Sequence, residues 1–304
     1  ADARIRAYSR ANGQRALRPK STETILLTNL ASEKKMSERP VLMRLERDGE
    51  IATIVLDNPK KLNAWSWESA RQISAIADEI RFDDSIRVVI MRAEGRAFCA
   101  GVDLGMPEDR ITGRSPAEKV RNYYEKFRWV HERFKVFAHL PQPTLIAING
   151  FCLGAGLEVA MMGDIRIAAD DAKFALPEPK VGVSIDAGGD MRLVQEIGSG
   201  WTKLLAMTGR RIDAETAARI GIVQEVVPAD QLQSHVRALA EEICGNAPLA
   251  VQGIKRTINF RAEQGLGEAM QFEAASASVL FTSDDMQLGY KAMASKEDAA
   301  FEGK

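Results

Sequence analysis

The sequence predicts an α/β fold in which parallel strands alternate with helices. Three short apolar runs carry this prediction: "IRVVIMRA" at 86–93, "TLIAIN" at 144–149 and "DIRIAA" at 164–169. Such nearly continuous apolar runs are typical of strands that are buried on both faces of a parallel sheet. Turns and helical segments separate the runs, and this alternation is the pattern of α/β domains.

A hairpin and a helix are predicted before these strands. From Val41 to Asp57 apolar and polar residues alternate on either side of "DGE", which is a β-hairpin signal. Residues 66–84 have helical spacing, with Ser66 as the N-cap and Glu68 in the first turn. The apolar residues of this helix share one face: Ala70, Ile73, Ile76 and Ile80.

The rest of the chain is predicted to be mostly helical. A long helix is expected around 116–139 and a short one opening at Gly156. After about residue 198 the strand pattern nearly vanishes, and successive helices are predicted at 200–209, 213–221, 229–246, 247–265 and 266–281. Several of these segments end in Gly or Asn, which supply left-handed caps. We therefore divide the chain into a tail at 1–35, an α/β core at 36–198 and a helical region at 199–304.

Composition restricts the class of protein. The 304 residues are 45% hydrophobic and 27% charged. No window holds the ~18 apolar residues that a membrane span requires. Three cysteines give no disulfide framework and indicate a reducing compartment. No Cys/His cluster has metal-ligand spacing, so we predict no metal.

Charge is distributed unevenly along the chain. Residues 1–35 carry eight Arg or Lys against three Asp or Glu, whereas the remainder carries 33 against 39. The acidic body argues against nucleic acid as the main partner. The basic tail fits a transit peptide, an upstream segment or expression remnant before Met36, or a disordered arm. We expect a disordered tail and a cytoplasmic protein, with a mitochondrial location as the alternative if the tail is a transit peptide.

The stretch "NGFCLGAGLEVAMMGDIRIAADDAKFALPEPKVGVSIDAGG" at 149–189 holds the candidate site. Its glycine-rich turn is followed by three spaced carboxylates, Glu158, Glu178 and Asp186. The G-x-G-x-x-G pattern of dinucleotide sites would need Gly or Ala where Val159 stands. Only about seven residues separate Gly156 from Asp164, fewer than the ~10–12 of a crossover helix. Neither a phosphate loop nor a G-x-S-x-G elbow is present.

A catalytic role for the glycine-rich turn accounts better for the nearby carboxylates. The first N–H groups of a helix lack intrahelical partners, and the helix dipole places partial positive charge there. An N–H at Ala155 or Gly156 and a second N–H from "CAGVDL" at 99–104 could converge on a carbonyl oxygen. Two converging amides make an oxyanion hole, which suits a thioester that passes through an enolate. Nearby carboxylates could then move protons at the neighbouring carbons.

Two segments resemble the signatures of the crotonase (enoyl-CoA hydratase/isomerase) superfamily. They are "FCAGVDL" at 98–104 and "INGFCLGAGLEVAMMGDIRIAADDAKFALPEPKVG" at 148–182. The resemblance extends from about Val41 to Phe301 through "NPKKLNAW", "MTGRRIDAETAARIGIVQEVVP" and "MASKEDAAF". It implies a crotonase-type spiral of repeated ββα units at 36–198, then a helical C-terminal assembly region. It also implies a homotrimer or a homohexamer.

The resemblance assigns roles to the residues of the site. It places the oxyanion-hole amides at Val102 and Ala155, the latter in a turn that the family commonly fills with Gly alone. Glu158 and Glu178 match the two catalytic glutamates of enoyl-CoA hydratases. Glu158 would help to deprotonate a water for attack at C3, and Glu178 would exchange a proton at C2. Two such carboxylates titrate as a coupled pair. Taken alone, Glu158 would be a surface helix residue and Glu178 a loop acid.

Asp186 departs from the hydratase pattern. Many hydratases have "PGAGG" where this chain has "IDAGG" at 185–189. An acid here resembles the dienoyl-CoA isomerases, where it takes part in proton transfer, the 4-chlorobenzoyl-CoA dehalogenases and the carnitinyl-CoA dehydratases. The dehalogenases lack the glutamate pair. The long segment before "PQPTLIAI" is closer to the dienoyl isomerases, which nevertheless have Asp in place of Glu158. Asp186 could instead cap the helix that begins near Gly188.

The resemblance also indicates contacts with coenzyme A. Lys60 would lie near the nucleotide, and the backbone from Ala97 to Ala100 near the adenine. Lys296 and Phe301 match C-terminal residues that contact coenzyme A, sometimes from a neighbouring subunit. Both lysines could equally be solvated surface residues.

Other residues beside the presumed cleft receive structural interpretations. Trp65 and Trp67 could border the acyl pocket or cover the first helix. We interpret four more residues as packing: Cys99, Cys152, Met161 and Met162.

The leading hypothesis is an enoyl-CoA hydratase, a lyase that reversibly adds water to a 2-enoyl-CoA thioester. The alternatives are a dienoyl-CoA or enoyl-CoA double-bond isomerase that uses Asp186, and an enzyme like the carnitinyl-CoA dehydratases. RNA binding, known among relatives, is disfavoured by the acidic body. Coenzyme A enters as part of the substrate, and no other cofactor is implied.

Overall fold

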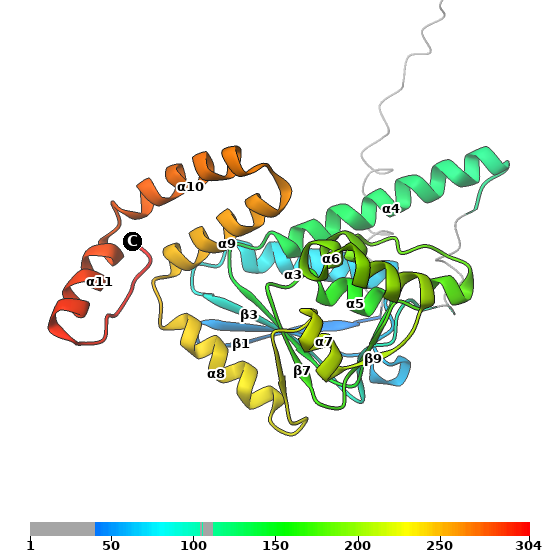
Figure 1. Cartoon of the computed structure of the whole chain (residues 1–304), viewed down its shortest axis with the longest axis horizontal. Coiled ribbons are helices and arrows are strands. Elements are labelled where there is room, and N and C mark those ends of the chain that lie inside the picture. The colour runs from blue at the N-terminus through cyan, green and yellow to red at the C-terminus, as the bar shows by residue number, and fades with distance from the viewer. Residues whose placement is uncertain (1–39, 104, 106–111) are drawn as a thin grey trace, which may run out of the picture. The chain divides into compact units, whose positions relative to one another are not determined.

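The computed structural model describes residues 40–103, 105 and 112–304, of which 41–304 form one compact unit (Figure 1). The strands form two sheets. The larger sheet has the order β1-β2-β3-β5-β7-β10, and the smaller has the order β4-β6-β8-β9. The predicted α/β class is confirmed. The predicted basic tail at 1–35 lies outside the described residues.

The larger sheet begins with the predicted hairpin. β1 (Met43–Asp48) and β2 (Ile51–Leu56) pair in antiparallel register, with Met43 opposite Leu56 and Asp48 opposite Ile51. Four strands extend the sheet in parallel: β3 (Val88–Ala93), β5 (Thr144–Ile148), β7 (Ile165–Ala169) and β10 (Glu225–Val227). The three apolar runs are therefore the central strands β3, β5 and β7, and nearly all their residues are buried.

From β3 to β8, consecutive strands alternate between the two sheets. β3, β5 and β7 join the larger sheet, whereas β4 (Ala97–Cys99), β6 (Phe151–Leu153) and β8 (Lys173–Ala175) join the smaller. Helical elements follow each pair: α4 (Pro116–Ala138), α5 (Ala155–Ala160), and η3 (Glu178–Val181) with α6 (Gly189–Thr208). This arrangement is the predicted spiral of ββα units.

The first helix has the predicted start and the predicted buried face. α3 (Trp67–Arg81) is capped by Ser66, whose Oγ accepts a hydrogen bond from the amide of Ser69 at 3.3 Å. Ala70, Ile73 and Ile80 are buried with Ala77, whereas Ile76 is half-buried. This face packs against β1 and α4. The helix thus closes one side of the core.

The region after residue 189 is mostly helical, with two short strands that the sequence prediction missed. The helices are α6, α7 (Ala214–Ile220), α8 (Leu232–Cys244), α9 (Pro248–Glu263), α10 (Leu266–Leu280) and α11 (Asp284–Ser295). α11 has no counterpart in the sequence prediction. The missed strands, β9 (Ile212–Asp213) and β10, are too short for alternation to reveal them. The border placed after residue 198 falls inside α6, where Gly198 has non-helical φ 75° and ψ 163°.

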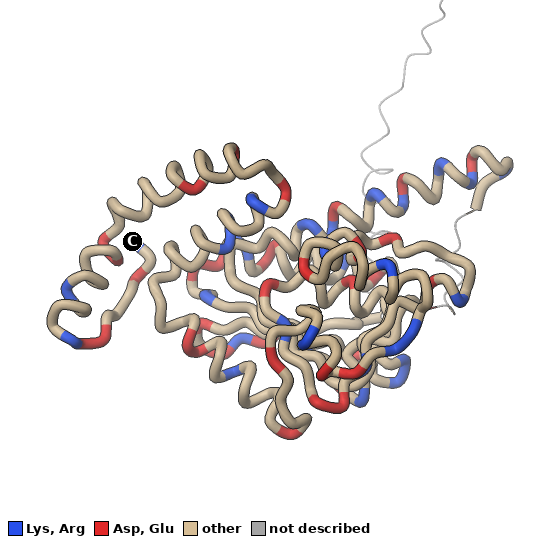
Figure 2. The backbone as a smooth tube through the Cα atoms, in the orientation of Figure 1, with Lys and Arg blue, Asp and Glu red and all other residues tan. Residues whose placement is uncertain are grey.

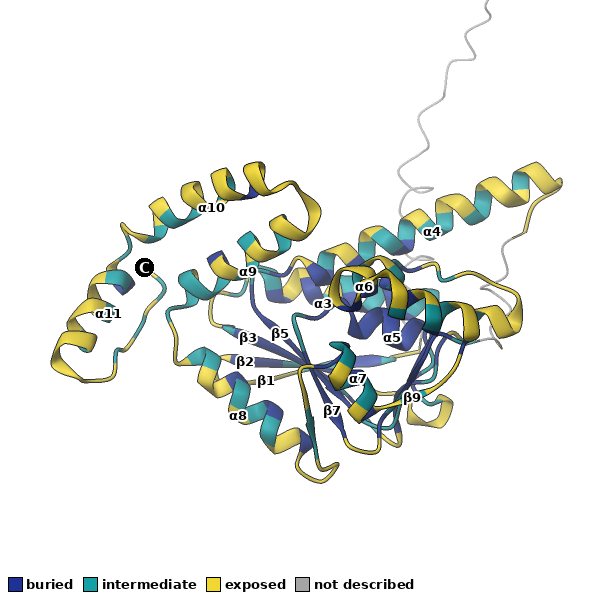
Figure 3. Cartoon of the chain, viewed as in Figure 1, coloured by how far each residue is buried: buried dark blue, intermediate teal, exposed yellow. Residues whose placement is uncertain are grey.

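The last three helices cover less of the core than α8 does. α8 buries Leu232, Val236 and Ala240 against the larger sheet. By contrast, most of α10 and α11 is exposed in the single chain (Figure 3). Large apolar side chains in or next to these two helices are at least 60% exposed: Leu266, Met270, Val279, Phe281 and Met293. Within the described ranges, no helix has the length and apolar character of a membrane span.

Candidate active site

Three parallel strands of the smaller sheet end at one edge and carry the predicted site. Val102 follows β4 by three residues, Ala155 follows β6 by two, and Glu178 follows β8 by three. β4 pairs in parallel with β6, and β6 with β8. The carboxyl ends of neighbouring parallel strands lie side by side, and ligands of α/β sheets bind beyond such ends. The topology therefore brings together residues that are far apart in the sequence.

Close backbone approaches hold these loops against one another. A Cβ atom at Gly101 would lie 3.3 Å from the carbonyl oxygen of Leu153, and one at Gly154 would lie 2.7 Å from Oε1 of Glu178. Gly154 also has φ +53° and ψ −124°, a conformation that other residues rarely adopt. A side chain at position 154 would both strain the turn and displace the Glu178 carboxylate.

The two predicted oxyanion-hole amides have no backbone partner within the described residues. Trp65 forms a parallel bridge with Val102, in which the Trp65 amide donates to the Gly101 carbonyl at 2.7 Å. The amide of Asp103 donates to the Trp65 carbonyl at 2.8 Å. The bridge uses the carbonyl of Gly101 and the amide of Asp103. The Val102 N–H therefore points away from Trp65. Ala155 opens α5, so its N–H has no intrahelical partner.

Glu158 lies on α5 and is only 2% exposed, which rules out its interpretation as a surface residue. Its Oε2 accepts hydrogen bonds from the amides of Ala187 at 2.8 Å and Gly189 at 3.1 Å. Burial raises the pKa of Glu158 to about 8. The Gly189 amide opposes the rise, the charge of Asp186 adds to it, and the Ala187 amide also opposes it. Burial and the neighbouring acids therefore disfavour the ionised form of Glu158.

Glu178 opens the helical turn η3 and is half-buried. Its Oε2 is buried and has no hydrogen-bond partner among the described residues. Burial raises the pKa of Glu178, its own backbone amide opposes this, and the charge of Asp186 adds to the rise. Glu178 also contributes to the raised pKa of Glu158, so the acids of the site interact electrostatically.

Asp186 lies in the loop between η3 and α6, and its side chain remains accessible. Partial desolvation raises the pKa of this carboxyl, and the nearby His131 opposes the rise. The proposed capping role is not observed, because the N-cap of α6 is Gly188 and no side-chain hydrogen bond caps the helix. Asp186 is therefore a member of the acidic group rather than a helix cap.

His131 is the residue that the sequence reasoning missed. In the sequence it is 55 residues from Asp186, yet its Nε2 lies 2.5 Å from the Asp186 carbonyl oxygen. The fold of α4 over the loop before α6 creates this contact. No local pattern around His131 could have indicated it.

The predicted coenzyme A residues fall into two groups. Lys60 lies in η1 (Pro59–Lys61), and Ala97 and Ala100 lie in or just after β4. Asn63 donates to the Ala97 carbonyl at 2.8 Å, and the Ala100 amide donates to the Leu62 carbonyl at 3.0 Å, so η1 adjoins β4.

Lys296 and Phe301 form the second group. They follow α11, and Figure 1 shows α11 lying far from α5. One chain therefore does not bring these two residues to the acids of the site.

The structural interpretations of four residues near the turn agree with the structure. Burial raises the pKa of the Cys99 thiol to about 12, which leaves it protonated. Cys152, Met161 and Met162 are buried in the core. Trp65 is also buried and packs edge-on against Phe134 of α4, whereas Trp67 is half-buried beside Phe127.

Charged residues of both signs are distributed along the described chain. Figure 2 shows Lys and Arg interleaved with Asp and Glu along the described backbone. Such a mixture is typical of a solvated surface. Within the described ranges, no three His, Cys, Asp or Glu residues are grouped to hold a metal.

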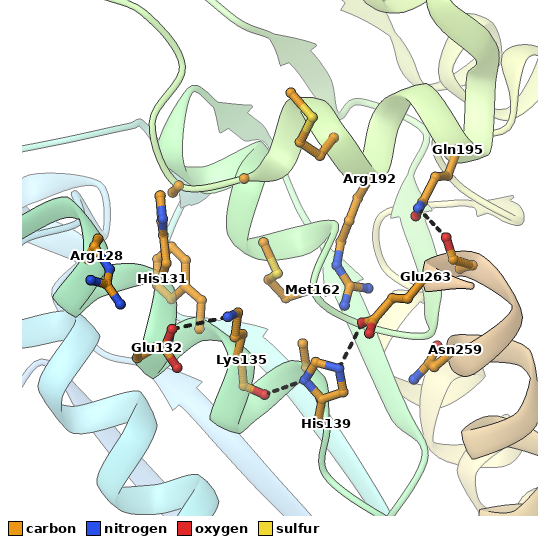
Figure 4. A pocket seen from close by; sticks show the side chains of 16 residues that line it. Arg128, His131, Glu132, Lys135, His139, Met162, Arg192, Gln195, Asn259 and Glu263 are labelled. Carbon is orange, nitrogen blue, oxygen red and sulfur yellow. Dashed lines mark hydrogen bonds and ion pairs between the residues drawn. The ribbon is translucent and has the colours of Figure 1, made fainter. Parts of the chain in front are cut away.

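A pocket of about 530 Å³ lies between α4, α6 and α9, next to the site (Figure 4). Neither Glu158 nor Glu178 lines it. Ala187 and Gly188 do line it, whereas the amides of Ala187 and Gly189 bind Glu158. The pocket therefore lies behind the loop that holds Glu158, and it is not the site of the acids themselves.

Comparisons with known proteins agree with this geometry. The family model described as "Enoyl-CoA hydratase/isomerase" matches residues 46–304. The mitochondrial Delta(3,5)-Delta(2,4)-dienoyl-CoA isomerase of Dictyostelium discoideum is 36% identical over 251 residues, which cover 80% of this chain and 85% of that protein. The short-chain-enoyl-CoA hydratase of Clostridium acetobutylicum is 33% identical over 247 residues, which cover 80% of this chain and 90% of that protein.

A solved structure shows the same fold. The crystal structure of enoyl-CoA hydratase from Bacillus anthracis matches with a TM-score of 0.79 and 30% identity. The match covers 87% of this chain and all of that chain. Hydratase and isomerase relatives are thus similar to this chain to nearly the same degree, so the residues of the site must distinguish the reactions.

Replacing Glu158 by Gln should make the free energy of unfolding less dependent on pH. The folded pKa of Glu158, about 8, lies above the ordinary value of 4.5. The stability that this proton supplies is complete below 4.5 and is lost as pH rises to 8, by up to about 1.4 kcal/mol per pH unit. Gln keeps an oxygen for the two amides but does not ionise.

Urea unfolding across this pH range measures the effect, with the exposed Glu215→Gln as the control. The native protein and the control should lose stability towards pH 8 more steeply than Glu158→Gln. Equal pH slopes for all three proteins would show that Glu158 is not a buried, proton-binding carboxyl.

Proposed function

The chain belongs to the enoyl-CoA hydratase/isomerase family, and from this premise we propose that it catalyses the reversible addition of water to a 2-enoyl-CoA thioester. One observation carries the proposal. Two carboxyl groups with raised pKa values, Glu158 and Glu178, flank the turn that presents the Ala155 amide. An acid–base pair beside an oxyanion hole suits proton transfer next to a thioester carbonyl.

Each group of the site has one role in the proposed reaction. The amides of Val102 and Ala155 bind the thioester oxygen, which gains negative charge as the enolate forms. Glu158 accepts a proton from water while the water oxygen bonds to C3. Glu178 gives a proton to C2, and the thioester carbonyl re-forms. Dehydration follows the same steps in reverse.

The electrostatics of the pair favour a state in which the two carboxyl groups share one proton. Addition requires one carboxylate to accept a proton and one carboxyl group to donate a proton. Burial and the repulsion between Glu158 and Glu178 oppose ionisation of both groups at once. The pair therefore titrates as a unit, and in its singly protonated state one group can accept a proton while the other donates one.

A second candidate function is double-bond isomerisation of an enoyl-CoA or dienoyl-CoA, and Asp186 is the observation that favours it. Asp186 contributes to the raised pKa values of both glutamates, so it belongs to the same group of acids. With water excluded, these acids would move a proton between two carbons. A dehydratase of the carnitinyl-CoA type would use the same groups to remove water.

Assembly and coenzyme A binding extend the proposal. The exposed apolar residues of α10 and α11 support assembly into a homotrimer or homohexamer. In such an assembly Lys296 and Phe301 would contact coenzyme A bound to a neighbouring subunit, while Lys60, Ala97 and Ala100 would contact it within one subunit. Coenzyme A is part of the substrate, and we propose no other cofactor.

We place the enzyme in a reducing compartment. The low cysteine count supports a cytoplasmic location, and the basic residues at 1–35 support a mitochondrial one.

The function is tested by giving the purified protein crotonyl-CoA. Hydration should remove the ultraviolet absorbance of the conjugated enoyl thioester, and the product should gain the mass of one water. An unchanged substrate, together with an isomer of unchanged mass from a 3,5-dienoyl-CoA, would contradict hydration and establish isomerisation.

Glu178→Gln should lower kcat by about 10²–10⁴-fold, because the amide keeps the shape of the side chain but cannot exchange a proton. Binding of coenzyme A thioesters should change little, since the substitution leaves the oxyanion-hole amides in place. Steady-state kinetics and a direct binding titration measure the two effects. Near-native turnover by this variant would refute the assigned role.

Asp186→Asn distinguishes the two candidate reactions. A hydratase should retain kcat within about tenfold, whereas an isomerase that uses Asp186 as acid or base should lose about 10²-fold or more. The variant is compared with the native protein on crotonyl-CoA and on a 3,5-dienoyl-CoA. A large loss on crotonyl-CoA would show that Asp186 takes part in hydration as well.

A further inference from the structure

We propose that His131 is a positioning residue for this reaction: its hydrogen bond to the Asp186 carbonyl holds the loop whose amides bind the Glu158 carboxyl. The inference rests on the proposed function, and it adds a residue on α4 to a site built from the ends of strands. His131 lines the pocket behind the loop, and Figure 4 shows its ring directed from α4 towards the segment that leads into α6.

The hydrogen bond has a defined direction. Nε2 of His131 lies 2.5 Å from the Asp186 carbonyl oxygen. A carbonyl oxygen only accepts, so Nε2 must carry the proton. Both the imidazolium and the neutral tautomer with a proton on Nε2 can donate this bond. His131 can therefore hold the loop in either charge state.

The opposite side of the loop is in direct contact with Glu158. The amide of Ala187, the residue next to Asp186, donates to Oε2 of Glu158 at 2.8 Å, and the amide of Gly189 donates to the same oxygen at 3.1 Å. A Cβ atom at Gly189 would lie only 2.6 Å from Cα of Glu158. The loop packs against Glu158 without spare room, so a shift at Asp186 would move both amides relative to the carboxyl.

The same face of α4 also supports the oxyanion half of the site. Phe134 is three residues from His131 and therefore shares its helix face. Phe134 is 3% exposed and packs edge-on against Trp65, with ring centroids 5.5 Å apart. Trp65 forms the backbone bridge with Val102. α4 thus contacts the loop that binds Glu158 through His131, and through Phe134 it contacts Trp65, which pairs with Val102.

Several charged groups line the same pocket as His131 or interact with it electrostatically. They come from α4, from the loop before α6, from α6 and from α9: Arg128, Glu132, Lys135, Asp186, Arg192 and Glu263. Both signs of charge are present in this neighbourhood. The donor on Nε2, rather than a change of charge, is what the loop requires.

His131→Met removes the donor and keeps an apolar side chain of similar length. Loss of the bond should lower kcat by about 10- to 100-fold, because small displacements of catalytic groups cost that much. KM should change less than about twofold, since a positioning residue acts through Glu158 rather than on the substrate. The two amides lower the pKa of Glu158, so their displacement should raise it and move the pH dependence of kcat to higher pH.

His131→Gln is the test of the hydrogen bond itself. The side-chain amide of Gln donates to a carbonyl as Nε2 does, so this variant should recover most of kcat and the native pH profile. Glu132→Gln is the control on the same turn of α4, where the carboxylate pairs with Lys135 at 3.1 Å. Equal impairment of the Gln and Met variants, or native kinetics in His131→Met, would overturn the proposal.

Hydrogen exchange of the Ala187 and Gly189 amides measures how firmly the loop is held, and it does not depend on catalytic activity. Both amides should exchange faster in His131→Met than in the native protein, and at the native rate in His131→Gln. Unchanged exchange in His131→Met would overturn the positioning role even if the protein hydrates no enoyl thioester. Native protein that is inactive, with faster exchange in His131→Met, would refute the proposed function and leave the role of His131 intact.

Discussion

Burial of the Glu158 carboxyl is the constraint on which the rest of the site depends. A carboxylate removed from water is costly unless it is protonated or hydrogen-bonded. Glu158 has both forms of compensation, because its pKa rises to about 8 and two amides bind one of its oxygens. Those amides belong to the loop that also carries Asp186. The hydrogen bonds to Glu158 therefore fix the loop, and they fix the position of Asp186 with it.

The spiral topology explains why no single repeat contains the site. Each ββα unit sends one strand to each sheet, so β4, β6 and β8 end side by side although their loops are far apart in the sequence. Val102 comes from the first of these ends, Ala155 and Glu158 from the second, and Glu178 from the third. α4 then contacts the loop before α6 through His131, and it contacts Trp65, the partner of Val102, through Phe134. The order of the strands in the smaller sheet thus brings the catalytic groups together.

The sequence predicts those parts of this arrangement that depend on local patterns. Ser66 and the apolar face of residues 70–80 are sufficient to predict α3, and the apolar runs predict β3, β5 and β7. The acids and glycines of 149–189 predict the candidate site because their spacing is local, and the resemblance to a family supplies their roles.

Non-local contacts account for what the sequence could not predict. The contact of His131 with Asp186 joins residues 55 positions apart. β10 has only three residues and exists because β7 offers it an edge to pair with. The burial of Glu158 follows from the close approach of Gly189, which no pattern around either residue reveals.

A crystal structure with a bound, unreactive acyl-CoA thioester tests the central claim most directly. The claim is that the two amides and the two glutamates surround one thioester. We expect the thioester oxygen to lie about 2.7–3.1 Å from the nitrogen atoms of both Val102 and Ala155. The second and third acyl carbons should lie between the carboxyl groups of Glu158 and Glu178. A thioester oxygen bound away from these amides, or an acyl chain that does not pass between the two glutamates, would contradict the account.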